Sequence, residues 1–142
     1  MRRTVKAFGR LDILVNNAAF QVQAARLANL SAEHFDETLK TNLYGYFFMA
    51  KAAAAEMRPG AAIINTGSVT GIPGSGGLLD YSMTRGGIHA FTRSLAMHLV
   101  PKGIRVNAVA PGHLDEAARS TGGDCSGICV FSLAAVIGGY TG

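Results

Sequence analysis

Three short apolar runs, separated by two long segments with helical periodicity, constrain the fold of this chain more than any other feature. The runs are Leu11–Val15, Ala61–Asn65 and Ile104–Ala110. Their length and aliphatic composition are typical of strands in a parallel sheet, and the first, LDILV, is expected to be buried on both faces. The order strand, helix, strand, helix, strand predicts an α/β fold with right-handed crossovers and a parallel sheet covered by helices.

Two long helices are predicted between these strands. The first is expected to begin after Ser31, a good N-cap, with Glu33 in its first turn, and to run until Pro59-Gly60 ends it. The second is expected to run roughly from Asp80 to Val100. A shorter helix is expected within residues 1–9. The residues that recur at helical spacing are Phe35, Leu39, Leu43, Phe47 and Ala50 in the first long helix and Ile88, Phe91, Leu95 and Leu99 in the second.

Composition narrows the class of protein further. The chain has 142 residues, 49% of them hydrophobic and 15% charged, which suits one compact domain. No apolar stretch approaches the roughly 20 residues that span a bilayer, and no signal peptide is evident, so we expect a cytoplasmic protein without a membrane partner. The net charge of +4 is scattered, which disfavours nucleic acid as a partner. Cys125 and Cys129 fit neither a redox nor a zinc motif, and no metal site is predicted.

A glycine-rich loop, INTGSVTGIPGSGG, follows the second apolar run over residues 64–77. Its spacing comes within one residue of the TGxxxGxG pattern that binds a pyrophosphate. A phosphate loop works because a helix starts directly after it and points free N–H groups at the anion. Here the helical pattern does not resume until about Asp80, and Pro73 removes one backbone donor. The loop is therefore predicted to be catalytic, and a glycine pattern alone is a weak signal.

A hydroxyl and a phenol support that interpretation. Ser68 ends the second strand, and Tyr81 opens the next helix with Arg85 four residues later, on the same helix face. A permanent cation beside a phenol favours the phenolate and lowers a tyrosine pKa that is normally about 10. A hydroxyl at the end of a strand that faces such a tyrosine makes a pair able to polarise a carbonyl group.

Five segments together resemble the classical short-chain dehydrogenase/reductase family, whose members are Rossmann-fold, NAD(P)-dependent oxidoreductases. The segments are RLDILVNNAA, TNLYGYFF, IINTGSVTG, YSMTRGGIHAFTRSLA and GIRVNAVAPG, in the family's order and at its spacing. They cover residues 10–112. Any one of them is a weak signal, whereas five in register make a highly specific match.

The resemblance implies a catalytic role for four residues. Tyr81 would be the general acid/base that exchanges a proton with the substrate oxygen, and Ser68 would hydrogen-bond that oxygen. Asn42 would hold a water in a proton relay. Arg85 would contact the nicotinamide ribose and lower the pKa of Tyr81. Taken singly, Asn42 is better explained as a polar residue on an amphipathic helix, Arg85 as a surface charge, and Pro111-Gly112 as an ordinary turn.

The resemblance also implies residues that bind NAD or NADP. Asn16, Asn17 and Ala18 match the family's NNAG turn, which steadies the sheet and approaches the adenosine ribose. Pro111 and Gly112 match the turn beside the nicotinamide, and Tyr81 and Arg85 would serve the cofactor as well as the reaction. Hydride would pass between the nicotinamide and a secondary alcohol or ketone.

The sequence departs from the family's pattern in three places. Arg85 stands where the family has lysine, and a planar guanidinium is not interchangeable with an ammonium group, so a weakened relay is expected. The first βαβ unit with its TGxxxGxG loop is absent, so the expected fold is a partial Rossmann-type doubly wound sheet of three core strands and two long helices. The tail, residues 113–142, diverges from the family. Within it, residues 128–137 fit either a strand or a helix, and residues 1–112 form the predicted domain.

The resulting functional expectation has two branches. The first is an NAD(P)-dependent oxidoreductase that interconverts an alcohol and a ketone, impaired in this chain alone. The second is a non-catalytic half-domain or gene fragment that associates with itself or with a full-length relative. The expected association surface lies on the helices near residues 32–57 and 80–100. With its neighbour strand missing, LDILV would present a bare hydrogen-bonding edge.

Overall fold

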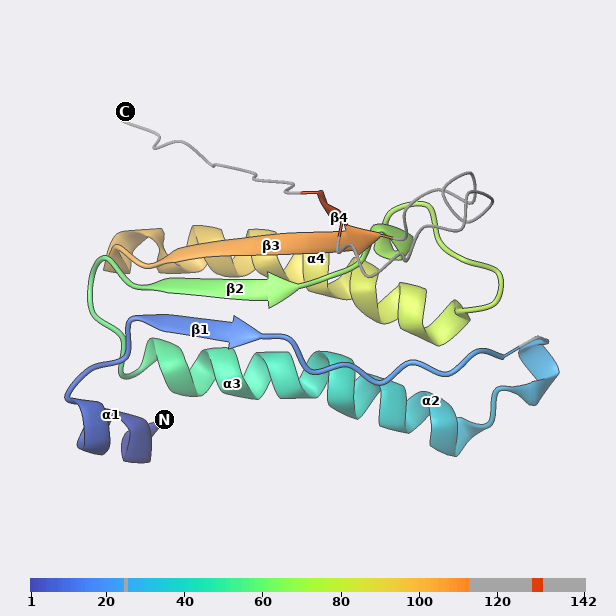
Figure 1. The fold of residues 1–142 in the computed structure, drawn as a ribbon, viewed down its shortest axis with the longest axis horizontal. Helices are drawn as coiled ribbons and strands as arrows, with labels where there is room; N and C mark the ends of the chain where they lie inside the picture. The colour runs from blue at the N-terminus through green and yellow to red at the C-terminus, as the bar shows by residue number, and fades with distance from the viewer. Residues whose placement is uncertain (25, 113–128, 132–142) are drawn as a thin grey trace, which may run out of the picture.

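The computed structural model describes residues 1–24, 26–112 and 129–131, which form one sheet flanked by helices (Figure 1). The elements, in chain order, are α1 (Arg2–Phe8), β1 (Ile13–Asn16), η1 (Leu27–Asn29), α2 (Ala32–Leu39), η2 (Lys40–Tyr44), α3 (Gly45–Ala54), β2 (Ala62–Thr66), η3 (Val69–Gly71), α4 (Leu79–Leu99), η4 (Val100–Lys102), β3 (Arg105–Gly112) and β4 (Cys129–Phe131). In the described part of the chain no helix is long and apolar enough to cross a membrane.

The strands lie in the order β1-β2-β3-β4 (Figure 1). β1, β2 and β3 are mutually parallel, and their register brings Leu14, Ile63 and Val106 side by side. β4 pairs antiparallel with the end of β3. The predicted α/β class with three parallel core strands is therefore confirmed, and residues 129–131 of the undecided segment form a strand.

One face of the sheet carries the hydrophobic core. The row Leu14–Ile63–Val106 packs against Ala50 and Ala53 of α3 and against Ala96 and Leu99 of α4 in a single cluster. Because side chains alternate along a strand, both long helices must lie on the face that carries this row. The two crossovers thus leave the sheet from one side, which is the geometry expected of successive right-handed βαβ units.

The opposite face of β1 is open among the described residues. Ile13 is 59% exposed and Val15 is 56% exposed, whereas Leu14 and Asn16, which alternate with them along the strand, are buried. The expectation that LDILV is buried on both faces is therefore wrong here. An apolar run specifies a strand, but only packing partners decide how many of its faces are covered, and α3 covers one.

The segment from α2 to α3 buries a different stripe from the one expected. The buried positions are Thr38, Asn42, Tyr46, Ala50 and Ala53, while Phe47 of the predicted stripe is 49% exposed. The wide π turn η2 falls inside this segment, and the Gly45 N–H bonds the Lys40 carbonyl five residues back. A spacing of four residues, rather than 3.6, keeps these positions on one face where the helix is widened.

Two predicted boundaries also differ from the structure. α3 ends at Ala54, before Pro59, because the N–H groups of Glu56 and Met57 both bond the Ala53 carbonyl and close the last turn. β3 continues through Pro111 and Gly112 instead of ending at Ala110, since both residues pair with β4. Residues 113–128 and 132–142 of the predicted divergent tail lie outside the described residues.

Candidate functional site

Ser68 lies where β2 has ended and the short helix η3 begins. Its backbone is extended, with φ −162° and ψ 153°, and its side chain caps η3 by accepting a hydrogen bond from the Thr70 N–H at 3.2 Å. Its Oγ is also 2.9 Å from the Thr70 hydroxyl. The residue is 7% exposed. Its hydroxyl is thus fixed at the carboxyl end of the sheet, where open α/β sheets bind ligands.

The glycines of this loop permit close packing on α4. A Cβ added to Gly67 would lie 2.4 Å from His89 Nε2, and one added to Gly71 would lie 2.6 Å from the Arg85 carbonyl carbon and 2.7 Å from the Gly86 nitrogen. Such distances exclude any side chain without a shift of the loop. Gly67 and Gly71 therefore have a packing role, which agrees with a loop that is not built around a phosphate.

The start of α4 already carries a negative group. α4 begins at Leu79, two residues after Gly77 and within one residue of the predicted start near Asp80. Asp80 lies in its first turn and is 3% exposed. A carboxylate at this place interacts favourably with the free N–H groups and with the positive end of the helix dipole. Asp80 therefore occupies the place at the start of this helix where an anionic phosphate would otherwise bind.

Tyr81 and Arg85 lie one turn apart on α4, as their spacing predicts. The Arg85 guanidinium carbon sits over the Tyr81 ring, 4.6 Å from its centroid, in a cation–π contact. Tyr81 is half-buried, whereas Arg85 is only 1% exposed. The cation therefore meets the face of the phenol ring.

Two oxygen acceptors also hold the Arg85 guanidinium. Its Nη1 donates to the Thr66 carbonyl at 2.7 Å and to the Tyr46 hydroxyl at 3.2 Å. Burial raises the pKa of Tyr46 above its ordinary value, and the hydrogen bond from Arg85 acts in the opposite direction. The sequence reasoning missed Tyr46. Its spacing of four residues from Asn42 on the same helical segment was the signal that could have found it.

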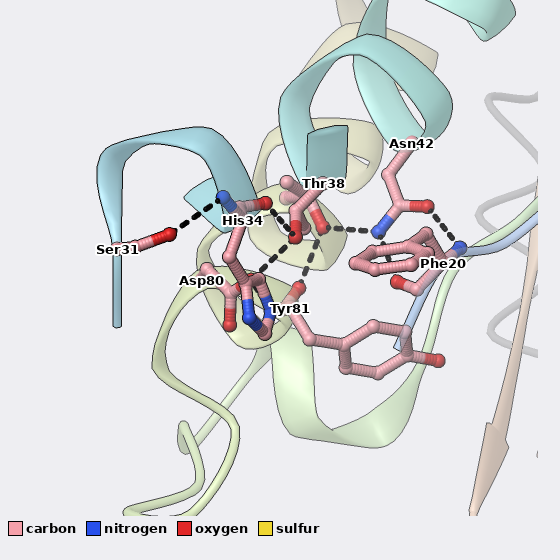
Figure 2. A network of polar contacts seen from close by, with 8 residues as sticks. Phe20, Ser31, His34, Thr38, Asn42, Asp80 and Tyr81 are labelled. Carbon is pink, nitrogen blue, oxygen red and sulfur yellow. Dashed lines mark hydrogen bonds and ion pairs between the residues drawn. The ribbon is translucent and has the colours of Figure 1, made fainter. Parts of the chain in front are cut away.

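Asn42 lies fully buried in the π turn, and its side chain joins two distant segments (Figure 2). Its Oδ1 accepts from the Phe20 N–H at 2.8 Å, and its Nδ2 donates to the Phe20 carbonyl at 2.9 Å. The same Nδ2 is 3.1 Å from the Thr84 hydroxyl, which itself donates to the Tyr81 carbonyl at 2.7 Å. The amide is thus connected to the Tyr81 turn, but its hydrogen-bonding groups are engaged by protein atoms.

A second polar group anchors the start of α4 to α2, and it is also visible in Figure 2. The Thr38 hydroxyl reaches both Asp80 Oδ2 and the His34 carbonyl. His34 Nε2 lies 3.2 Å from Asp80 Oδ2, and the Ser31 hydroxyl accepts from the His34 N–H, which confirms Ser31 as the N-cap. These contacts fix the residue that directly precedes Tyr81. No motif in the sequence pointed to this group.

The three residues of the predicted cofactor turn after β1 have different surroundings. Asn16 is 5% exposed and donates from Nδ2 to Asn65 Oδ1 at 2.9 Å, while Asn65 donates to the Thr92 hydroxyl at 3.0 Å. This chain of bonds ties β1 to β2 and to α4. Asn17 and Ala18 are exposed at the carboxyl end of β1.

The Pro111–Gly112 pair lies close to the Ser68 loop. A Cβ added to Gly112 would lie 2.9 Å from a methyl carbon of Val69, the residue that follows Ser68. The end of β3 therefore lies in close contact with η3. The structure brings Ser68, Tyr81, Arg85, Asn42 and Gly112 to one end of the sheet, and Asn16, the last residue of β1, is bonded there to Asn65 of β2.

His89 is a buried titratable group beneath the loop. It is 8% exposed and packs against Gly67. Burial, followed by repulsion from Arg93, lowers the pKa of His89 below its ordinary value, and a hydrogen bond with the Ser68 backbone opposes this change. The packing of Gly67 on the His89 ring thus keeps this imidazole out of water beneath the loop.

This arrangement has the parts needed to move a proton at a substrate oxygen. It offers a hydroxyl at a strand end, a phenol on the adjoining helix and a permanent cation against that phenol ring. In addition, the carboxyl ends of β1 to β3 lie beside it, which is where a ligand of an open parallel sheet binds.

Comparison with known sequences gives consistent matches. The family model described as enoyl-(acyl carrier protein) reductase matches residues 1–128. The glucose and ribitol dehydrogenase of Daucus carota is 49% identical over 110 residues, which are 78% of this chain and 38% of that protein. The chloroplastic NADPH-dependent aldehyde reductase 1 of Arabidopsis thaliana is 47% identical over 108 residues, 76% of this chain and 38% of that protein.

Solved structures agree with these sequence matches. A dehydrogenase/reductase from Sinorhizobium meliloti 1021 superposes with a TM-score of 0.75 at 36% identity, over 80% of this chain and 45% of that one. ElxO, solved with NADP bound, gives a TM-score of 0.76 at 34% identity, over 84% of this chain and 49% of that one. The chain thus spans less than half the length of the proteins that it matches.

Proposed function

The chain belongs to the short-chain dehydrogenase/reductase family, and from this premise we propose that it supplies the catalytic residues of an NAD(P)-dependent oxidoreductase that interconverts a secondary alcohol and a ketone. One observation carries the proposal. The loop that bears Ser68 packs without space for a side chain at Gly71 on the turn of α4 that bears Arg85, which in turn lies against Tyr81. The Ser68 loop and the Tyr81–Arg85 turn, which are separate motifs in the sequence, therefore lie next to each other.

In the proposed reaction Tyr81 exchanges a proton between its phenolic oxygen and the substrate oxygen. Ser68 donates a hydrogen bond to the same substrate oxygen and stabilises negative charge there. Arg85 keeps a positive charge beside Tyr81 in every state of the reaction. Both Asn42 Nδ2 hydrogens are donated, to Phe20 and Thr84, so a relay water at this place would donate to the remaining lone pair of Asn42 Oδ1.

The described residues fit one end of a nicotinamide cofactor. We propose that Tyr81 and Arg85 hold the nicotinamide ribose, and Arg85 Nε is a buried donor with no hydrogen-bond partner among the described residues. Pro111 and Gly112 are proposed to lie beside the nicotinamide, and residues 16–18 near the adenosine ribose. The cofactor, when bound, supplies or accepts the hydride. NAD and NADP are equally compatible with these residues.

The pyrophosphate does not fit the described residues equally well. Gly67 and Gly71 are occupied by packing, and Asp80 places negative charge at the start of α4. We therefore propose that residues 1–112 form the catalytic unit of this chain and bind a dinucleotide weakly when alone.

Cofactor titration of the folded chain tests this proposal. We expect weak binding of NADPH or NADH, followed by nicotinamide fluorescence, and slow reduction of a panel of ketones. The matched pair of variants is Tyr81→Phe, which should abolish turnover, and Tyr44→Phe, which should retain it because Tyr44 is 52% exposed. Equal turnover in the two variants would count against Tyr81 as the acid/base.

A second candidate function is association without catalysis. Exposed apolar residues favour it: Ile13 and Val15 on the open face of β1, and a groove of about 420 Å³ between α3 and α4 lined by Phe47, Phe91 and Leu95. We propose that this groove, with the two long helices, forms a contact between copies of the chain or with a full-length relative. Folded protein that associates but binds no cofactor up to millimolar concentration would favour this candidate.

A further inference from the structure

Arg85 is a buried cation whose position depends on neutral acceptors. It is 1% exposed, whereas every other arginine of the described residues is exposed. Among the described residues no carboxylate forms an ion pair with it. A buried charge is costly unless hydrogen bonds satisfy it. The acceptors around Arg85 therefore decide where its guanidinium can lie.

Two such acceptors come from different elements. The Thr66 carbonyl at the end of β2 and the Tyr46 hydroxyl of α3 both accept from Nη1, at 2.7 and 3.2 Å. The Tyr46 hydroxyl in turn donates to the Thr66 carbonyl at 3.0 Å. These three bonds close a triangle between α3, β2 and α4. The same guanidinium lies over the Tyr81 ring.

We propose that Tyr46 is a positioning residue, whose hydroxyl together with the Thr66 carbonyl holds the Arg85 guanidinium against the Tyr81 ring. A guanidinium presents its donors in a fixed plane, so it needs acceptors at set places, unlike the single flexible donor group of a lysine. Tyr46 supplies the acceptor that arginine requires at this position. Its importance for catalysis rests on the proposed function, but the positioning itself does not.

The competing explanation is that Tyr46 only fills the core. Tyr46 is 2% exposed, and its hydroxyl would be satisfied by the Thr66 carbonyl alone. In that case removing the hydroxyl would lower stability and leave the Arg85 guanidinium unchanged. The two explanations therefore differ in what happens to Arg85, not in what happens to the fold.

Arginine-selective ¹⁵N NMR of the full chain separates them. Arg85 should give slowly exchanging guanidinium signals, assigned by their loss in Arg85→Lys, because the other described arginines are exposed. In Tyr46→Phe we expect exchange of the Arg85 guanidinium protons to become faster by at least about tenfold, since a hydrogen bond to a charged group is lost. The control Tyr44→Phe, in the same helical segment, should leave them unchanged. Unchanged Arg85 signals in a folded Tyr46→Phe protein would overturn the proposal.

A second measurement, in which Arg85 is replaced and Tyr46 is observed, covers the case in which Tyr46→Phe does not fold. The hydrogen bond from Arg85 lowers the pKa of Tyr46, against the effect of burial. In Arg85→Met, tyrosine absorbance should show Tyr46 ionising at higher pH than in the parent chain. An unchanged titration would contradict the pairing. If Tyr46→Phe releases Arg85 and yet neither protein turns over substrate, the positioning role stands and the proposed reaction fails.

Discussion

At the scale of single residues, the exchange of one cation for another changes the site. Lysine stands at position 85 in the pattern that the chain resembles, and here arginine occupies it. The guanidinium bonds the Thr66 carbonyl and stacks on the Tyr81 ring. The sequence predicted which residues would meet, because spacing on a helix fixes their face. The spacing of Tyr46 from Asn42 indicates a shared helix face, but it does not indicate that the Tyr46 hydroxyl meets Arg85, because that contact joins two separate elements.

Gly71 should tolerate no side chain. We expect Gly71→Ala to lower the free energy of unfolding by about 1–3 kcal/mol, because its Cβ would meet the backbone of Arg85 and Gly86 rather than a movable side chain. Gly76→Ala is the matched control, since its Cβ would find nothing within 4 Å. Urea unfolding of both variants checks the difference, and equal midpoints would refute the close approach.

His89 should make stability depend on pH in mildly acidic solution. Its pKa in the folded protein lies below the ordinary value of 6.5, so the unfolded chain binds its proton more readily. The stabilising contribution is complete above about pH 6.5 and is lost as the pH falls through the folded pKa. His89→Gln should reduce the pH dependence of the urea midpoint below about pH 6.5. The exposed His98 offers the control His98→Gln, and an unchanged slope in His89→Gln would contradict this origin.

At the scale of elements, the order and type of the strands and long helices could be predicted, whereas their burial could not. Short aliphatic runs bounded by turn residues indicate strands whatever surrounds them. The exposure of Ile13 and Val15 depends on which elements cover β1, and the LDILV run contains no such information. Similarly, the π turn η2 contains Asn42, whose side-chain amide forms two hydrogen bonds with the Phe20 backbone. These bonds join segments that lie far apart in the chain.

The start of α4 should depend on Asp80. Asp80→Ala removes one of the two acceptors within reach of the buried Thr38 hydroxyl and the negative group in the first turn of α4. We expect the free energy of unfolding to fall by about 1–3 kcal/mol. Asp36→Ala is the control, because Asp36 forms only an exposed pair with Lys40 and should cost well under about 1 kcal/mol. Thermal unfolding of the two variants measures the difference. Equal losses of stability would show that the role assigned to Asp80 is wrong.

At the scale of the whole molecule, the described residues bring the proposed catalytic side chains to one end of the sheet and leave apolar surfaces exposed. The rings of Phe47 and Phe91 lie 6.3 Å apart in the groove between α3 and α4. The sequence indicated both helices as an association surface, and this remains a prediction. The NAD(P)-dependent reaction also remains a proposal, because the chain spans 38% of the Daucus carota relative.

Association through the groove predicts a change in oligomeric state. Phe47→Ser should shift the protein to a smaller species in analytical ultracentrifugation, because a large apolar contact is lost from the interface. Met97→Ser provides the control, since Met97 is 64% exposed on α4 but does not line the groove. A Phe47→Ser protein that sediments like the parent would place the contact elsewhere.

The catalytic assignment itself is tested most directly in a chimaera. In it, residues 10–112 of this chain replace the matching segment of the Daucus carota glucose and ribitol dehydrogenase, which supplies the remaining parts of the fold. We predict a folded chimaera that binds NAD or NADP and turns over substrate, and a Tyr81→Phe version about 10²- to 10⁴-fold slower with unchanged cofactor binding. A folded, cofactor-binding chimaera whose turnover is the same with tyrosine or phenylalanine at position 81 would contradict the account.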